Sequence, residues 1–275
     1  MGNKALWRKA IGDARLLLLF LTALLFGFNW LFVYLSSLID LGPLGVFLQT
    51  LPPAFEKLSG VPFASVATPV GRISAAYVDP VVLFATTIWA VGRGSDAVSG
   101  EIGRGTMEML LAQPVRRISV LATQAAVTTL GSAVLATAVL LGTCMGLATV
   151  SLSEHVDWTT FVPGAVNLFA MMFFLSGVST LVSSTDNHRW RTIGVVGGFY
   201  VVQLVFKVIG RLVDRFSWLM YLTFGTACEP QALVIDAEQA WALSVRYDGV
   251  LIGIGLACYV VAAAIFSQRD LPAPL

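Results

Sequence analysis

Polar and apolar side chains alternate in the segment from Ser99 to Arg117, Ser-Gly-Glu-Ile-Gly-Arg-Gly-Thr-Met-Glu-Met-Leu-Leu-Ala-Gln-Pro-Val-Arg-Arg. Thr106 is suited to cap a short helix that runs to about Ala112, and Pro114 ends it. A short helix with an apolar face and charged neighbours fits a groove in a protein partner. The chemistry that we expect here is therefore recognition of a partner, and the segment 99–114 is the candidate site.

Nine residues of this segment, namely Glu101, Arg104, Gly105, Thr106, Met107, Glu108, Leu110, Leu111 and Pro114, are expected to serve in docking. The apolar side chains are predicted to enter the partner's groove and the charged ones to contact its rim. Gly105 and Thr106 begin the helix. The apolar set is Met107, Leu110 and Leu111, and the polar set is Glu101, Arg104 and Glu108. The alternative for Arg104, Arg116 and Arg117 is that they only fix the topology of the chain in the membrane, and for the pair Arg116 and Arg117 the two interpretations weigh equally.

Side chains that could catalyse a reaction or bind a metal are widely scattered. His155 and His188 fall in loops on opposite predicted faces of the membrane. Cys144, Cys228 and Cys258 lack the spacing of metal ligands, and two of them lie inside apolar runs. We therefore predict no catalytic residue, no metal site and no cofactor in this chain.

The composition excludes a water-soluble surface. Of the 275 residues, 57% are hydrophobic and 12% are charged, whereas a soluble domain has roughly 25% charged residues. The net charge of +1 comes without a basic stripe, so no nucleic acid is expected as a partner. Membrane lipid is expected to surround the chain.

The elements that must position the candidate site are apolar helices. We predict an all-α polytopic membrane protein, a single permease domain over 1–275, with six transmembrane helices. Each run approaches the roughly 20 residues that cross a bilayer. The predicted spans are about 16–36, 80–98, 122–150, 163–183, 192–210 and 249–267.

Individual features support these spans. The run that follows Arg15 is too long for a secretory signal peptide and predicts a retained span. Asp79 and Pro80 suit the cap and the first turn of the second span. Residues 118–153 contain no Asp, Glu, Lys, Arg or His, and one long helix fits their length better than two spans.

Three segments are predicted to be helical without crossing the membrane. Residues 5–14 have the pattern of an N-terminal interfacial helix, with an apolar face formed by Leu6, Ala10 and Ala14. Residues 40–71 are rich in Pro and Gly and predict a folded loop with short helices. The apolar run 216–227 is too short to span and predicts a re-entrant segment before the last span.

The distribution of Lys and Arg predicts the orientation. With a cytoplasmic N-terminus, eleven of these residues fall on the inner side and six on the outer side. An even number of spans then brings both termini into the cytoplasm. We expect a multi-pass protein of the cell (inner) membrane, with the segment 99–114 on its cytoplasmic side.

The candidate segment resembles the permeases of type-2 ABC exporters, which have a Ser-Gly-Glu, Gly-Thr, Glu-x-Leu-Leu and Pro-Val run after their second span. The matching residues are Ser99, Gly100, Glu101, Gly105, Thr106, Glu108, Leu110, Leu111, Pro114 and Val115. Met109 stands where the family often has another aliphatic residue. The stretch 221–233 is similar to the family's re-entrant segment, so the resemblance covers nearly the whole chain.

The resemblance implies two permease subunits, identical or different, docked on two ATPase subunits through cytoplasmic coupling helices. ATP and magnesium would bind to the ATPase, which must be a separate polypeptide, since a P-loop needs Lys followed by Ser or Thr. In this chain the four lysines, Lys4, Lys9, Lys57 and Lys207, precede Ala5, Ala10, Leu58 and Val208. The chain itself is then not an enzyme.

Two other classes of function serve as alternatives. An ion-coupled secondary transporter or an intramembrane enzyme would need ionisable groups at bilayer depth, and the predicted spans hold them only near their ends, as Arg93, Asp96 and Lys207. Uncharged spans suit a hydrophobic or amphipathic cargo such as a lipid, peptide or drug. The short single-domain form resembles the permeases that help mature copper enzymes such as nitrous oxide reductase, as well as sodium or antibiotic exporters.

Overall fold

A computed structural model describes residues 2–38, 50, 52–112, 115–150, 156–236 and 239–269, and these form helices and no strand. Six helices in the described ranges are long and apolar enough to cross a membrane. They run over Lys4–Leu38, Pro69–Gly103, Arg117–Thr149, Trp158–Thr185, Arg189–Leu212 and Ala240–Gln268. The all-α fold with six spans is therefore confirmed.

The regular α-helical parts of these spans are α1 (Gly2–Leu38), α6 (Pro80–Ser95), α9 (Arg117–Thr149), α10 (Val162–Thr185), α11 (Arg189–Leu212) and α13 (Ala240–Gln268). Short α-helices are α3 (Pro53–Ser59), α4 (Phe63–Val66), α5 (Pro69–Ser74), α7 (Glu101–Gly103), α8 (Thr106–Leu111) and α12 (Pro230–Ile235). The remaining turns are η1 (Ala75–Val78), η2 (Asp96–Gly100), η3 (Trp158–Phe161), η4 (Asp214–Leu222) and η5 (Phe224–Thr226).

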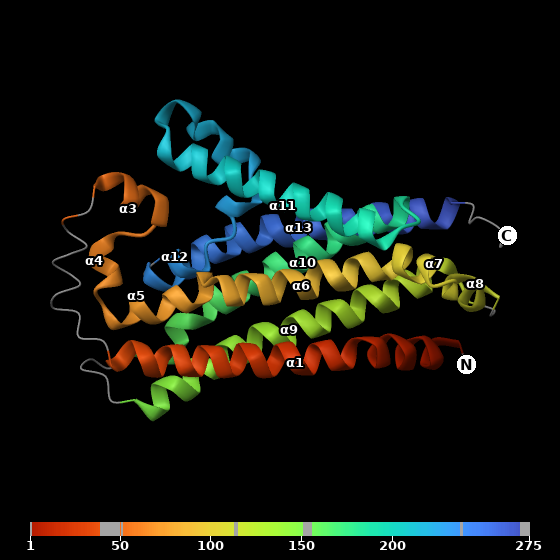
Figure 1. The fold of residues 1–275 in the computed structure, drawn as a ribbon, viewed down its shortest axis with the longest axis horizontal. Helices are drawn as coiled ribbons and strands as arrows, with labels where there is room; N and C mark the ends of the chain where they lie inside the picture. Colours follow the sequence, from red (N-terminus) through yellow and green to blue (C-terminus); the bar gives the residue numbers. More distant parts are fainter. Residues whose placement is uncertain are drawn as a thin grey trace.

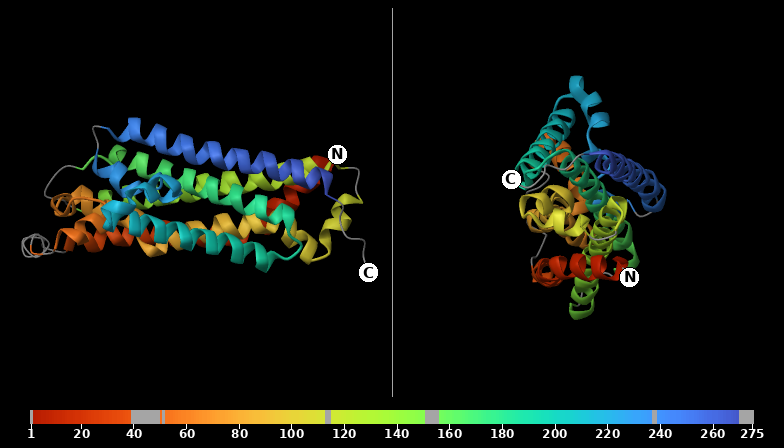
Figure 2. Two further views of the ribbon diagram at one scale, coloured as in Figure 1. Left: turned by 90° about the horizontal axis from the view of Figure 1, so that it is seen from above. Right: turned by 90° about the vertical axis from the view of Figure 1, so that its right-hand side faces the viewer.

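The long helices form one elongated bundle (Figure 1). The start of α1 and the end of α13 lie at one end of the bundle together with α7 and α8, and α3, α4, α5 and α12 lie at the other. Two further views show the same separation (Figure 2). The first turns of α1 and the last turns of α13 therefore lie near the described part of the segment 99–114.

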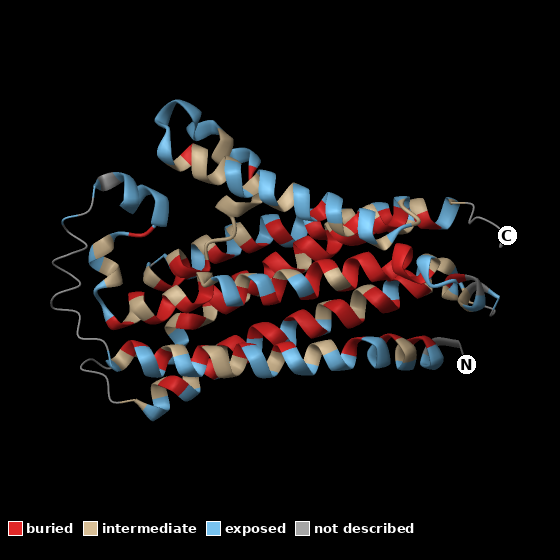
Figure 3. Cartoon of the chain, viewed as in Figure 1, coloured by how far each residue is buried: buried red, intermediate tan, exposed pale blue. Residues whose placement is uncertain are grey.

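The core lies where α10 meets its neighbours. Helix α10 packs along α13 and α6, and α1 packs along α9. Buried residues concentrate on α6, α9 and α10, whereas α11 is mostly exposed (Figure 3). Within the core Trp89 donates its indole N–H to Ser132 Oγ at 3.1 Å, and the Tyr77 hydroxyl lies 3.3 Å from Thr143 Oγ1. These bonds satisfy polar groups that would otherwise be costly in an apolar interior.

The N-terminal residues 5–14 differ from the prediction of a separate interfacial helix. They form the first turns of α1, which continues without a break to Leu38. The predicted apolar face is real, but Leu6, Ala10 and Ala14 are buried inside the protein. The amphipathic pattern therefore reflects packing against the bundle, because a helix face covered by protein has the same periodicity as one covered by lipid.

The second and sixth spans are longer than predicted. Asp79 caps α6 as expected, accepting a hydrogen bond from the Val81 amide at 2.8 Å. Helix α13 begins at Ala240 rather than Gly249, so Asp248 lies inside this helix and is buried. Its carboxylate accepts hydrogen bonds from Asn167 Nδ2 at 2.6 Å and from the Ser244 hydroxyl. The expectation that ionisable groups in the spans stay near Arg93, Asp96 and Lys207 was wrong for this residue.

The segments between spans contain the short helices that were predicted. Of the loop 40–71, the described part forms α3, α4 and the start of α5, and residues 39–49 and 51 lie outside the described ranges. The run 216–227 forms η4 and η5, which turn back from the end of α11 and pack against it (Figure 1). Phe224 anchors this return, with its ring centroid 5.0 Å from that of Phe174 and 6.0 Å from that of Phe199.

Glycines allow α10 and α13 to approach closely. A Cβ added to Gly177 would lie 2.6 Å from the carbonyl oxygen of Gly255, closer than real atoms permit. No atom lies within 4 Å of a Cβ added to Gly194, Gly197 or Gly198 on α11. Gly255 therefore packs closely within this chain, whereas the three α11 positions are open within the described residues.

The close contact predicts that Gly177→Ala destabilises the protein by about 1–3 kcal/mol, because the added methyl group must push α10 from the α13 backbone. Gly253→Ala on α13 is the matched control. A Cβ there meets nothing within 4 Å, so the change should be neutral or stabilise by up to about 1 kcal/mol. Titration of the detergent-solubilised variants with a denaturing detergent measures both, and equal effects would contradict the packing argument.

Candidate functional site

The second span does not stop at the end of α6. Its axis continues through η2, a π-helical turn, into α7. A π turn inserts an extra residue into the helix and is common at functional sites. Within two turns, Asp96, Ser99 and Glu101 therefore point toward different neighbouring helices. The candidate segment is thus a direct extension of a membrane span.

Hydroxyl groups attach this turn to α10 and α11. Ser183 Oγ accepts hydrogen bonds from the backbone amides of Val98 at 3.2 Å and Ser99 at 2.8 Å. Ser99 Oγ donates to the carbonyl oxygen of Ser95 at 2.8 Å and lies 3.0 Å from Thr192 Oγ1. All of these side chains are buried. The turn, which continues α6, is therefore held by two further helices, α10 and α11.

Asp96 gathers three arginines around one buried carboxylate. Its oxygens lie 2.6 Å from Arg104 Nη1, 3.6 Å from Arg189 Nη1 and 3.7 Å from Arg93 Nη1. The hydrogen bond to Asp96 is the main cause that raises the pKa of the Arg104 guanidinium above its usual range. A Cβ on Gly100 would lie 2.2 Å from Asp96 Oδ1, so this position must remain glycine for the carboxylate to take its place.

Glu101 forms the second centre of charge. Its side chain is fully buried and pairs with Lys9 of α1 and with Arg104, whose Nη2 lies 3.2 Å from Oε1. The Thr106 hydroxyl, at the start of α8, donates to its other oxygen. A buried carboxylate needs such partners, because an unpaired charge in the interior is very costly. Glu101 thus joins α1, α7 and α8.

Arg93 extends the same set of contacts into the bundle. Its side chain is 4% exposed, and Nη2 donates to Gln124 Oε1 on α9 at 2.7 Å. A polar cleft of about 430 Å³ lies between these groups and α1, and Lys9, Asp13 and Arg189 also line it. We call the set Lys9, Arg93, Asp96, Glu101, Arg104 and Arg189 the charge cluster. It connects α1, α6 and α11 to η2 and α7, and the bond from Arg93 to Gln124 adds α9.

Two predicted docking residues are not available to a partner. Met107 is 2% exposed and packs in this chain against Val98, Leu121 and Phe266. Glu101 is buried as described above. Met107 was predicted to contact the partner's groove and Glu101 its rim. In the structure both side chains instead hold the segment against its own bundle. In place of Met107, Met109 points outward and is 67% exposed.

The other predicted residues lie as follows. Gly105 has φ +69°, a left-handed conformation that side chains rarely adopt, and this kink separates α7 from α8. Leu110 is half-buried, and the side chain of Arg104 is 43% exposed. Pro114 and the side chains of Glu108 and Leu111 lie outside the described residues.

Sequence reasoning missed the partners of the segment. Lys9 and Arg189 lie far from it in the sequence, and Gln124 looks like an ordinary polar residue at the start of a span. The spacing of Arg93 and Asp96 was the available signal, and the structure shows that this pair is buried rather than directed toward solvent. No group of three or more His, Cys, Asp or Glu is placed to hold a metal ion in the described part of the chain.

The fold and the charge cluster define a class: a polytopic helical membrane protein in which an end segment is mechanically joined to several spans. A model of the family described as ABC-2 family transporter protein matches residues 7–271. The chain belongs to this family and is a transmembrane component of an ABC transporter, not itself a catalytic enzyme. None of the curated proteins compared with the chain matches it.

The buried position of Glu101 predicts that Glu101→Gln destabilises the protein by roughly 2 kcal/mol. This is less than the ~3–5 kcal/mol of a fully buried pair, because Lys9 and Arg104 keep part of their contact with water. Asp214→Asn is the control, since its 2.9 Å ion pair with Lys57 is exposed and should contribute less than about 1 kcal/mol. Denaturing-detergent titration compares them; equal effects would refute the burial argument.

Proposed function

We propose that this chain forms the translocation path of an ATP-driven exporter and receives its power stroke, at the segment η2–α8, from a separate ATPase subunit. Membership of the ABC-2 transporter family supports a transmembrane role. The observation that carries the coupling proposal is the charge cluster, which joins this one segment to α1, α6, α9 and α11.

Force transmission explains why the segment is attached in this way. A soluble motor can move a membrane domain only if its contact element shifts as a rigid body together with the spans. Asp96 and Glu101 hold the segment through charged hydrogen bonds, which are the strong ones. Ser183 and Thr192 hold it through hydroxyl groups on α10 and α11. A displacement of α8 is therefore passed to most of the bundle.

The surface offered to the ATPase is smaller than the sequence suggested. Met109 is largely exposed, Leu110 is half-buried and Arg104 is partly exposed beside them. A flexible methionine adapts to the shape of an apolar groove, and Arg104 can contact a carboxylate at its rim. Glu108, Leu111 and Pro114 remain part of the proposed contact on the basis of the sequence alone. ATP and magnesium belong to the partner.

A second permease subunit, identical or different, is part of the proposal. Gly194 and Gly198 on α11 have the small-x-x-x-small spacing with which membrane helices pack closely. Their Cβ positions are open within the described part of this chain. Of the six candidate spans, α11 has the smallest share of buried residues, 11%. This face is available to a helix of the second subunit. We place the assembly in the cell (inner) membrane with both termini in the cytoplasm.

The coupling proposal predicts that Met109→Asp and Leu110→Asp abolish the stimulation of ATPase activity by the permease and abolish transport. A carboxylate in an apolar groove would be buried without a partner. The loss should be at least about tenfold in a reconstituted complex with the ATPase, because an unpartnered buried charge costs more than 1.4 kcal/mol. Membrane insertion should be unchanged, since α8 lies at the end of the bundle.

Phe55→Asp provides the matched control. Phe55 is an exposed apolar residue of α3, at the opposite end of the bundle, so its replacement should leave the stimulation intact. Full stimulation by Met109→Asp and Leu110→Asp would contradict the assignment of α8. Equal loss in all three variants would point to a general defect of the membrane domain.

The proposed orientation has its own test. A reporter fused after Gln268 and a reporter fused after Ala112 should both be active in the cytoplasm, because both positions lie at the end of the bundle that carries the termini (Figure 1). A reporter fused after Ser59 should be active only outside. Finding the first two reporters on opposite sides would refute the topology.

A further inference from the structure

A second chemically distinctive region lies at the opposite end of the bundle, remote from the charge cluster. Here a cavity of about 230 Å³ opens between α6, α10 and the last turns of α11. Residues 224–232 and the end of α3 complete its wall. The cavity therefore forms where the returning segment η5–α12 folds against two spans.

Two cations in this cavity share one carboxylate. Lys207 and Arg211 lie one turn apart on α11, and both contact the same oxygen, Oε1 of Glu229. The Lys207 ammonium is 3.2 Å from this oxygen and 3.3 Å from the carbonyl oxygen of Cys228. All three charged side chains are at most 17% exposed. The charged groups that line the cavity thus carry one positive charge in excess.

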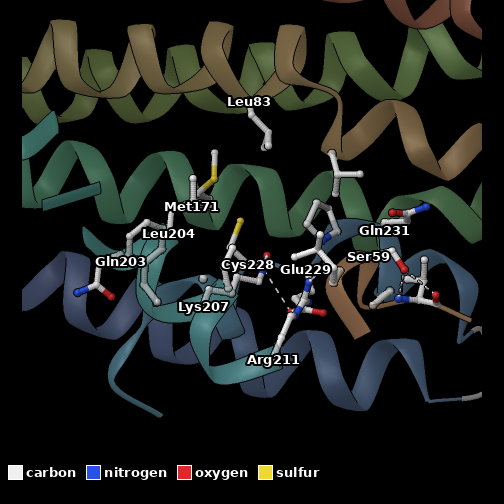
Figure 4. Close-up of a pocket in the computed structure, with 18 of the residues that line it drawn as sticks. Ser59, Leu83, Met171, Gln203, Leu204, Lys207, Arg211, Cys228, Glu229 and Gln231 are labelled. Atoms are coloured by element: carbon white, nitrogen blue, oxygen red, sulfur yellow. Dashed lines mark hydrogen bonds and ion pairs between the residues drawn. The ribbon is translucent and has the colours of Figure 1, made fainter. Parts of the chain in front are cut away.

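Most of the remaining wall is apolar. Figure 4 shows Leu83, Met171 and Leu204 around the space beside the charged side chains. Val208 and Phe224 add to this surface. Burying an excess charge next to such a wall is unfavourable unless a counter-ion is supplied. A ligand with a negative head and an apolar body satisfies both parts of the cavity.

A polar group without a partner supports a ligand at this place. Gln203 lines the cavity, and its Oε1 atom is buried with no hydrogen-bond partner in the described residues. A half-turn of the amide would present two N–H donors instead. These donors would then lie on α11 one turn before Lys207, on the same side of the helix as the two cations.

We propose that this cavity binds an amphipathic anion: a carboxylate or phosphate headgroup on one acyl-like chain. The headgroup binds Lys207 and Arg211, and the chain lies along Leu83, Met171 and Leu204. The cavity is smaller than the ~300–1,000 Å³ of sites for drug-sized ligands, which favours a single chain. The proposal does not depend on ATPase coupling, because binding can be measured on the permease alone.

The experiment measures equilibrium binding of radiolabelled dodecanoate and dodecyl phosphate to the full chain in nanodiscs of zwitterionic lipid. Dodecanol and inorganic phosphate are the comparison probes. We expect both amphipathic anions to bind at least about tenfold more tightly than either comparison probe, since each of those lacks one half of the interaction. The stronger of the two anions identifies the headgroup as carboxylate or phosphate.

Two substitutions are expected to have opposite effects. Lys207→Met removes the excess positive charge and should weaken dodecanoate binding about tenfold or more. Glu229→Gln releases both cations and should strengthen it. If the triad of Lys207, Arg211 and Glu229 had only a structural role, both substitutions would weaken binding. Lys57→Met is the control: Lys57 is a cation at the same end that pairs with Asp214 and does not line the cavity, so binding should be unchanged.

Three outcomes would overturn the proposal. Dodecanol binding as tightly as dodecanoate would show that the cations contribute nothing. Inorganic phosphate binding as tightly as dodecyl phosphate would identify a simple anion site. The third outcome is weaker dodecanoate binding in Glu229→Gln while Lys207→Met keeps a monodisperse profile in size-exclusion chromatography. It would show that Lys207, Arg211 and Glu229 only stabilise the fold.

Discussion

The structure depends on one electrostatic constraint: charged side chains buried at the ends of an apolar bundle must be paired. In hydrocarbon an unpaired charge is too costly to keep. Asp96 and Glu101, which are buried on the continuation of α6, therefore collect Lys9, Arg93, Arg104 and Arg189. These partners come from different helices, so satisfying two carboxylates also fixes how the helices are joined.

The same constraint operates differently at the two ends of the bundle. In the charge cluster, protein side chains supply the partners of both carboxylates, and the result is a joint between helices. At the other end Glu229 is shared by Lys207 and Arg211 beside an apolar cavity. The outer cations of the charge cluster reach water, since the side chains of Lys9, Arg104 and Arg189 are 33–43% exposed. Lys207 and Arg211 are at most 17% exposed, so their excess positive charge favours a bound counter-ion. The need to pair buried charges thus produces a joint between helices at one end of the bundle and a candidate binding site at the other.

Most of the fold could be predicted from the sequence, because bilayer thickness fixes the length of an apolar helix. All six spans were found in this way, and local chemistry also placed the Asp79 cap correctly. The errors arose where an ionisable residue lies inside the bundle. Asp248 was left outside the predicted span 249–267, because no pattern along the chain shows that Asn167 and Ser244 hold its carboxylate. Such partners come from tertiary contacts.

The same limit applies to the candidate site: the wrongly predicted roles of two of its residues show how the segment is held. The position of the segment was predictable, but Met107 and Glu101 were expected to face a partner and instead fasten the segment to its own bundle. A contact element that transmits force needs an inner face and an outer face, because an element held on one side only would bend. Met107 and Glu101 form the inner face; Met109, which is exposed, belongs to the outer face. Within α8, the opposite placement of Met107 and Met109 follows from the helical period, since residues two positions apart lie on different faces of a helix.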